Sequence, residues 1–195
     1  MKSFIRDFLI TFLLAIVIYA GLRGTIKHSV VVSPSMVPSL VVGQHLVINL
    51  LAYKFHEPQR GDIVVFHPVN GQQGDYIKRI VGLPGETVDV RGGVVYLHLV
   101  DGSTVALKEP YIISPAMADY RGRKIPQNEY FMMGDNRNNS GDSREGWTVP
   151  RRNIIGKAGL SIWPPEKWGL AANYPLQREI GSATSQRLLE GSLTP

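Results

Sequence analysis

Cysteine is absent from the sequence of 195 residues. This absence excludes disulfide bonds, thiolate catalysis and cysteine-ligated metals, so the fold depends on its core alone. The five histidines do not stand in an H-x-x-x-H or similar spacing, and we expect no metal and no other cofactor.

Long runs of basic residues are also missing, because the charges that give a formal net charge of +5 are scattered. The sequence has no helix-turn-helix pattern, no zinc-ligand spacing and no aromatic RNA-binding pattern, so we expect no nucleic-acid partner. The weak positive charge is compatible with attraction to anionic lipid headgroups or with simple solubility.

After the N-terminus, no convincing amphipathic helix and no internal repeat is present. Short segments rich in Val, Ile, Tyr and Phe are instead bounded by Gly, Pro, Asn or Asp, which predicts strands joined by turns. The predicted strands cover residues 29–32, 45–49, 62–67, 76–81, 87–90, 94–100, 104–107, 130–133 and 154–162. The sequence therefore predicts a mainly β domain over residues 28–170.

Two turn signals, Arg91-Gly92-Gly93 and Asp101-Gly102, indicate a small β-hairpin insert over residues 94–124. Residues 171–195 are polar, with few large apolar side chains. We expect this tail to be loosely ordered or to lie on the surface, and it carries no interpretable motif.

An uncharged run, FLITFLLAIVIYAGL, covers residues 8–22. With the adjacent apolar residues it reaches the roughly 20 residues that cross a bilayer core, which predicts a transmembrane anchor within residues 1–27. A cleaved signal peptide and a buried core helix are the alternatives, and Ile18 is a poor residue at −3 for a cut after Ala20. Basic residues flank the run on both sides, so charge leaves its orientation open.

The first segment with chemical potential is SPSMVPSL, which begins at Ser33. A serine held on a rigid turn at the end of a strand can present a nucleophile beside exposed backbone N–H groups. Ser/Pro-rich loops are also common connectors, so this segment alone does not identify a site.

The second segment, GDYIKRIVGLPGE, places Lys78 inside an apolar strand pattern. Strand alternation puts Tyr76, Lys78 and Ile80 on one face. Burial disfavours the charged form of a lysine and lowers its pKa, and a neutral amine near a serine hydroxyl can act as a general base. The alternative is a lysine that faces solvent from a half-exposed strand.

The third segment, GDNRNNSGDSR, covers residues 134–144 and is dense in polar side chains. A calcium loop that starts at Asp135 fails, because its third position is Arg137 and its sixth is Ser140. We expect instead a hydrogen-bonded loop that pairs carboxylates with arginines and holds neighbouring side chains in place.

In this order, behind an apolar N-terminus, the three segments resemble bacterial type I signal peptidase over roughly residues 4–170. The patterns S-x-S-M-x-P, K-R-x-x-G-x-P-G and G-D-N-R-x-N-S-x-D-S-R carry this resemblance, and GDIVVF at residues 61–66 matches a structural strand. The resemblance implies a coiled antiparallel β-sheet catalytic domain with a small β-hairpin insert, preceded by one transmembrane helix. It also implies a membrane-bound serine endopeptidase that removes signal peptides after small residues of the A-x-A type.

The resemblance implies that Ser35 is the nucleophile and Lys78 the general base. The Ser33 hydroxyl and the Ser35 N–H would form the oxyanion hole, and Ser140 would hydrogen-bond the Lys78 amine. The loop would add an ion pair between two supporting residues, Asp142 and Arg144. Six residues would line the substrate cleft and its shallow pockets: Val31, Met36, Leu40, Asp75, Tyr76 and Ile77.

The implied location is the plasma (inner) membrane, with a single pass and the catalytic domain on the extracytoplasmic side. The implied partners are signal peptides of exported preproteins and the lipid bilayer, and the protein is expected to be monomeric. Pro34 and Ser39 depart from the family pattern, which often has Gly and Thr there. Pro34 lacks an N–H and makes the loop stiffer.

Other functions stay open on the sequence alone. A Ser-His-Asp triad would need one of five histidines outside the three segments: His28, His45, His56, His67 and His98. A membrane-tethered β domain that binds extended peptides without cutting them would keep Ser35 and Lys78 too far apart to hydrogen-bond. A purely structural domain would have no cleft. Other Ser/Lys peptidases, from organelles or conjugation systems, are possible relatives.

Overall fold

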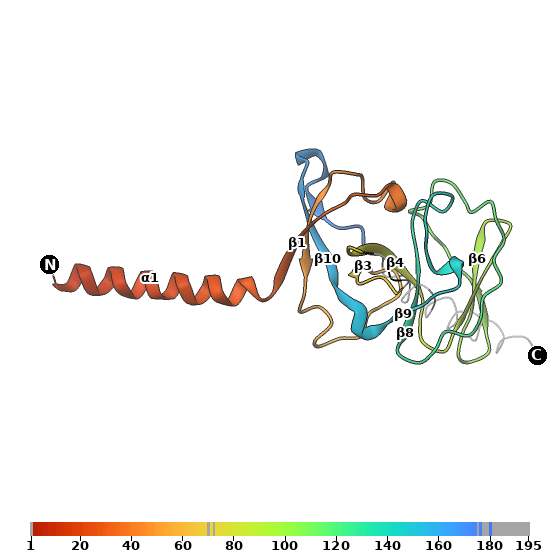
Figure 1. The fold of residues 1–195 in the computed structure, drawn as a ribbon, viewed down its shortest axis with the longest axis horizontal. Coiled ribbons are helices and arrows are strands. Elements are labelled where there is room, and N and C mark those ends of the chain that lie inside the picture. Colours follow the sequence, from red (N-terminus) through yellow and green to blue (C-terminus); the bar gives the residue numbers. More distant parts are fainter. Residues whose placement is uncertain (1, 70, 72, 175, 177–179, 181–195) are drawn as a thin grey trace, which may run out of the picture.

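The computed structural model describes residues 2–69, 71, 73–174, 176 and 180. Helix α1 (Lys2–Arg23) contains the uncharged run and extends away from a β-rich body, which it joins at strand β1 (Ile26–Val30) (Figure 1). Its large apolar side chains between Phe4 and Tyr19 are exposed. Among the described residues, no helix combines the length and the apolar character that crossing a membrane requires.

The main sheet has eight strands and is antiparallel throughout. Its order is β1-β2-β10-β3-β4-β8-β9, and β11 pairs with β10. Beyond β1, its strands are β2 (His45–Asn49), β3 (Ile63–Phe66), β4 (Tyr76–Gly82), β8 (Glu129–Met133), β9 (Val149–Pro150), β10 (Ile154–Trp163) and β11 (Gly169–Leu170).

Register shifts bend this sheet. Three of them interrupt the ladders of β10, and a fourth lies where β4 pairs with β8. Bulges of this kind increase the local twist of a strand, so the sheet curls. The prediction of a mainly β fold built on a coiled antiparallel sheet is confirmed.

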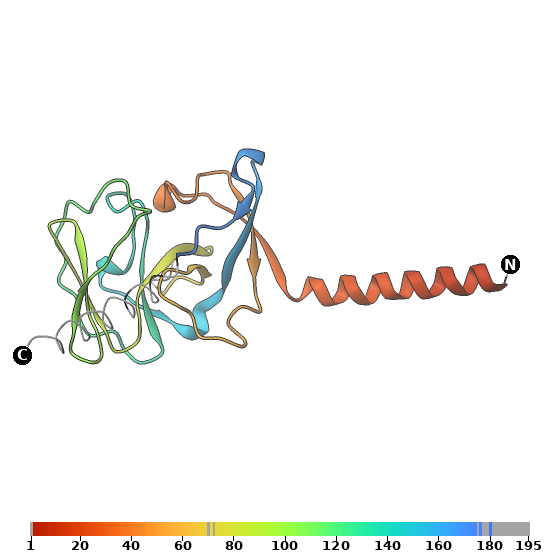
Figure 2. The ribbon, with the colours of Figure 1, turned by 180° about the vertical axis from the view of Figure 1, so that it is seen from behind.

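A second, three-stranded sheet consists of β5 (Thr87–Arg91), β6 (Val94–His98) and β7 (Thr104–Ala106). It begins before the residues 94–124 that the sequence assigns to the insert, and the chain returns to β5 through bridges at Tyr120 and Lys124. The two views place this sheet and α1 at opposite ends of the molecule (Figures 1 and 2).

Among the described residues, four short 3-10 helices lie in the connections between strands: η1 (Pro34–Met36), η2 (Ser143–Glu145), η3 (Arg151–Asn153) and η4 (Pro165–Lys167). The first follows β1, and the second lies in the dense polar segment 134–144 and just beyond it. Both therefore come from segments that the sequence singles out for chemistry.

In the part of the chain that the structure describes, the apolar core is divided into three clusters, and one of them unites the small sheet with the main sheet. This cluster also contains Leu176 and Ile180, which are buried although they belong to the polar tail. The expectation of a loosely ordered tail otherwise falls on residues 175, 177–179 and 181–195, which lie outside the described residues. Among the described residues, the core therefore extends past position 170.

Candidate active site

Ser35 lies on η1, directly after the edge strand β1, and its side chain is buried. Ser33 caps this short helix, because its Oγ accepts a hydrogen bond of 3.3 Å from the Ser35 N–H. Asn136 holds the turn from the opposite side. Its N–H donates to the Ser35 carbonyl oxygen at 2.9 Å, and its Nδ2 donates to the Pro34 carbonyl oxygen at 3.2 Å. Asn136 therefore fixes the turn through the carbonyl groups of Pro34 and Ser35.

Lys78 lies on β4, and only 5% of its surface is exposed. Its Nζ donates to Ser35 Oγ at 2.7 Å and to the Ile77 carbonyl oxygen at 3.3 Å. Burial lowers the pKa of the Lys78 ammonium group, and the carboxylates of Asp142, Glu145 and Asp135 oppose this shift only in part. The contact therefore joins a serine hydroxyl to an amine that burial makes easier to deprotonate.

This geometry separates the alternatives that the sequence leaves open. Ser35 and Lys78 are within hydrogen-bond distance, which is opposite to what a binding domain without catalysis requires. In the part of the chain that the structure describes, Ser35 Oγ bonds to Lys78 and to no histidine. Instead, His28 and His45 contact each other, and His67 contacts Asp75.

The cleft beside Ser35 and Lys78 has a volume of about 680 Å³. Residues 28–33 form one wall and residues 73–78 the other, with Asn139, Gly141 and Glu145 beside Lys78. Strand β1 stands at the edge of the sheet, and β8 pairs with β4 only from Arg79 onward. Two strand edges therefore face this cleft, a geometry that suits an extended peptide.

Four of the six predicted substrate-binding residues line this cleft: Val31, Asp75, Tyr76 and Ile77. The other two do not line it, which corrects the prediction. Met36 and Leu40 are fully buried in the cluster that contains Val31, against which Ile77 packs. The physical reason is that η1 turns the chain inward after Ser35, so these apolar side chains enter the core instead of facing the cleft.

Ser140 is placed differently from the prediction. Its Oγ is buried without a hydrogen-bond partner among the described residues, and the Lys78 amine bonds to Ser35 and Ile77 instead. Ser140 does lie close to the nucleophile turn. A side-chain carbon at Gly134 would lie 2.2 Å from Ser140 Oγ and 2.5 Å from the Ser35 carbonyl oxygen, so this close approach requires glycine.

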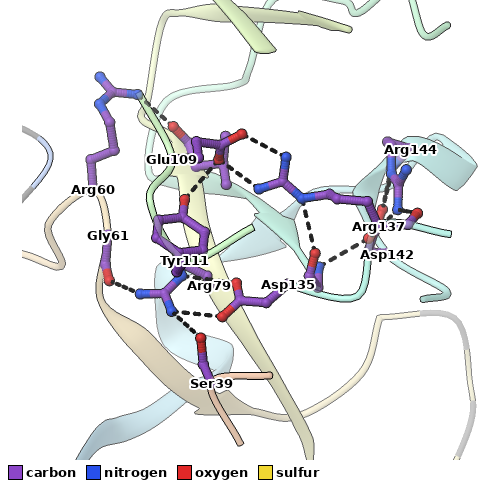
Figure 3. A network of polar contacts seen from close by, with 12 residues as sticks. Ser39, Arg60, Gly61, Arg79, Glu109, Tyr111, Asp135, Arg137, Asp142 and Arg144 are labelled. Atoms are coloured by element: carbon purple, nitrogen blue, oxygen red, sulfur yellow. Dashed lines mark hydrogen bonds and ion pairs between the residues drawn. The ribbon is translucent and has the colours of Figure 1, made fainter. Parts of the chain in front are cut away.

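The predicted ion pair between Asp142 and Arg144 is present. Nε of Arg144 donates to Asp142 Oδ1 and Nη2 to Oδ2, each at 2.8 Å, and Asp142 is fully buried. Asp142 also accepts the Gly134 N–H at 3.0 Å, and Arg144 donates to the Arg137 carbonyl oxygen at 2.7 Å. The pair therefore ties both ends of the polar loop together (Figure 3).

Sequence reasoning missed a second buried pair beside the site. Arg79 follows Lys78 and binds both carboxylate oxygens of Asp135, at 2.9 and 2.7 Å, and neither side chain is exposed. Its guanidinium group also lies 4.0 Å from the ring centroid of Tyr111 (Figure 3). An arginine next to Lys78 in an apolar strand, together with an acidic loop, was the available signal.

The comparisons with known proteins agree on one family. The family model described as signal peptidase, peptidase S26, matches residues 5–163. A signal peptidase I of Leptolyngbya laminosa is 42% identical over 80% of this chain and 78% of its own length. A probable signal peptidase I-1 of Synechocystis is 37% identical over 88% of this chain and 89% of its own length.

Among solved structures, a signal peptidase I from Enterococcus faecalis V583 has 31% sequence identity to this chain. The match covers 52% of this chain and 97% of that one, with a TM-score of 0.45. The extent of the family match and the identity to the two bacterial relatives lead to one conclusion: the chain belongs to the signal peptidase family, peptidase S26.

Proposed function

We propose that this protein is a serine endopeptidase that removes N-terminal signal peptides from secreted preproteins, with Ser35 as nucleophile and Lys78 as general base. The observation that carries the proposal is the contact of 2.7 Å between Lys78 Nζ and Ser35 Oγ at a cleft between two strand edges. The names of the relatives, which are signal peptidases, support the choice of substrate.

In the first step, the neutral amine of Lys78 accepts the proton of the Ser35 hydroxyl as Oγ attacks the scissile carbonyl carbon. A C–O bond forms, and the carbonyl oxygen takes up negative charge. The Ser35 N–H and the Ser33 hydroxyl stabilise this oxyanion. In the structure, the Ser35 N–H donates a long hydrogen bond of 3.3 Å to Ser33 Oγ. Because this hydrogen bond is long, little free energy is lost when both groups bind the substrate oxygen instead.

In the second step, the Lys78 ammonium gives its proton to the leaving amine, and the C–N bond breaks. An acyl ester on Ser35 remains. Lys78, neutral again, then takes a proton from a water molecule that attacks this ester. The ester C–O bond breaks, Lys78 returns the proton to Ser35 Oγ, and the signal peptide leaves with a free carboxyl group. Buried carboxylates such as Asp142 moderate the fall in the Lys78 pKa and stabilise its charged intermediate form.

The substrate lies in the cleft as an extended strand between the edges of β1 and β4. Its residues at −1 and −3 are two apart and therefore point to the same face. Met36 and Leu40 fill the core behind Val31, so the pockets on that face are shallow. Small side chains fit such pockets, which supports specificity of the A-x-A type.

We further propose that residues 1–27 form the membrane anchor and residues 28–170 the peptidase domain, at the plasma (inner) membrane. In this proposal, the catalytic domain lies on the extracytoplasmic side, and the protein is a monomer. Support comes from the uncharged run at residues 8–22 and from the exposure of its apolar side chains on a helix that extends from the β body. Retention of the full chain in membranes after carbonate washing tests the anchor, and release into the wash contradicts it.

The central experiment is cleavage of a purified preprotein whose signal peptide ends in A-x-A, by the full chain in detergent. We expect Lys78→Met to lower kcat/KM by about 10²–10⁴, the usual contribution of a general base. Lys54→Met, at an exposed lysine, is the matched control and keeps full activity. Equal cleavage by both variants would show that Lys78 is structural. Binding without cleavage by the unchanged protein would favour a peptide-binding domain.

A further inference from the structure

One ion pair joins Asp75, in one wall of the substrate cleft, to Lys27, which directly precedes residues 28–33 of the other wall. Lys27, on β1, reaches across to Asp75, directly before β4, and its Nζ lies 2.6 Å from Asp75 Oδ2. These strands are not neighbours, because β2, β10 and β3 lie between them in the sheet. The pair is therefore a contact across the open side of the curled sheet.

The pair lies at the end of the cleft opposite to the catalytic residues. Asp75 is three residues before Lys78, which corresponds to about 10 Å along an extended strand at roughly 3.3 Å per residue. On the other wall, Lys27 is four residues after the end of α1. A peptide with its scissile bond at Ser35 therefore reaches the pair about four residues before the cut.

The more exposed member of this ion pair is the cation. Asp75 is engaged at both oxygens, by Lys27 at Oδ2 and by His67 Nδ1 at Oδ1, at 2.9 Å. Its side chain is 25% exposed, whereas that of Lys27 is 42% exposed. An ammonium group has three donors, and Asp75 uses one of them. The remaining donors suit a carbonyl or carboxylate oxygen and disfavour a second cation.

We infer that the Lys27–Asp75 pair is a charge-selective end of the substrate cleft. It accepts neutral or acidic side chains at the fourth or fifth residue before the scissile bond and disfavours Lys and Arg there. The inference rests on the proposed function, and on the N-terminal part of the substrate running toward α1. That direction follows because the apolar part of a signal peptide and α1 would enter the same bilayer.

The experiment uses peptides that end in A-x-A before the cut and differ only at −4 and −5, which are both Ala, both Glu or both Lys. For the full chain in detergent, we expect the Lys peptide to have a kcat/KM roughly tenfold below that of the Glu peptide. This is the order expected for charges about 4 Å apart that water screens almost as strongly as in bulk solution, as at an open, exposed site. The difference should lie mainly in KM and should shrink in 1 M salt.

Variants of Lys27 and Asp75 distinguish an ion pair that selects substrates by charge from one that only stabilises the fold. Lys27→Glu with Asp75→Lys restores an ion pair with reversed polarity, and Lys27→Glu alone leaves two facing carboxylates. We expect both to prefer the Lys peptide over the Glu peptide. Lys54→Glu makes the same change in net charge as Lys27→Glu alone, at an exposed lysine outside the cleft, and keeps the original preference.

Each outcome has a definite meaning. An inverted preference in the Lys27 variants supports the inference, since a structural tie would slow all three peptides alike. Equal rates for the Glu and Lys peptides with the unchanged protein overturn the inference while the proposed function stands. If the Ala peptide itself is not cut, the proposed function fails, and this inference fails with it.

Discussion

Removing the carboxylate of Asp135 should destabilise the protein strongly, because Arg79 would keep its charge in a fully buried position. The carboxylate accepts two hydrogen bonds from Arg79, and neither side chain is exposed. Breaking a buried pair of this kind costs about 3–5 kcal/mol. In Asp135→Ala, Arg79 retains the carbonyl oxygens of Gly61 and Ala172 and the ring face of Tyr111. We therefore expect the lower value, about 3 kcal/mol.

This loss is measurable by two methods. Chemical denaturation of the purified full chain in detergent gives the free energy of unfolding, provided that the slope against denaturant is unchanged. For a chain of this size, each kcal/mol lowers Tm by about 2–4 °C, so the expected fall in Tm is roughly 6–12 °C. Asp101→Ala is the matched control, since Asp101 is exposed and its side chain accepts hydrogen bonds from Ser103.

The same change should also affect catalysis. Asn136, the next residue, donates its N–H to the carbonyl oxygen of Ser35, so movement of Asp135 is transmitted to the nucleophile. We expect kcat to fall more than KM rises. If Asp135→Ala unfolds at the same denaturant concentration as Asp101→Ala, the buried pair does not stabilise the fold and the reasoning is wrong.

Three further predictions concern other parts of the molecule. The kcat/KM should rise with pH as Lys78 loses its proton, with a midpoint below the usual lysine range because burial lowers its pKa; a midpoint within that range contradicts this. Gly134→Ala should impair both folding and cleavage, because the new carbon would lie 2.5 Å from the Ser35 carbonyl oxygen, whereas Gly24→Ala, which meets no atom within 4 Å, should not. Leu176→Ala should lower the free energy of unfolding by about 2–5 kcal/mol, and a loss below about 1 kcal/mol would show that this side chain is not part of the core.

The class of fold and the residue types of the site were predictable from the sequence. Short apolar segments between turn residues indicate strands, because this preference depends on a few neighbouring residues. The serine in SPSM, the lysine in an apolar strand and the polar segment 134–144 indicate the chemistry only together, through the family that they resemble in this order. The Asp142–Arg144 pair was implied by the family resemblance, and its members are only two residues apart.

The tertiary structure decided which of these groups meet. Ser35 and Lys78 are 43 positions apart, Lys27 and Asp75 are 48 apart, and Arg79 and Asp135 are 56 apart.

A local sequence pattern does not encode contacts between residues so far apart in the chain. These contacts depend on how far the bulged sheet curls and on which strand edges remain open. The burial of Met36 and Leu40 follows from the direction in which η1 turns the chain. The residue types that carry the chemistry are thus a property of local sequence. Their convergence at one cleft is a property of the curled sheet, because only its long-range packing brings the distant segments together.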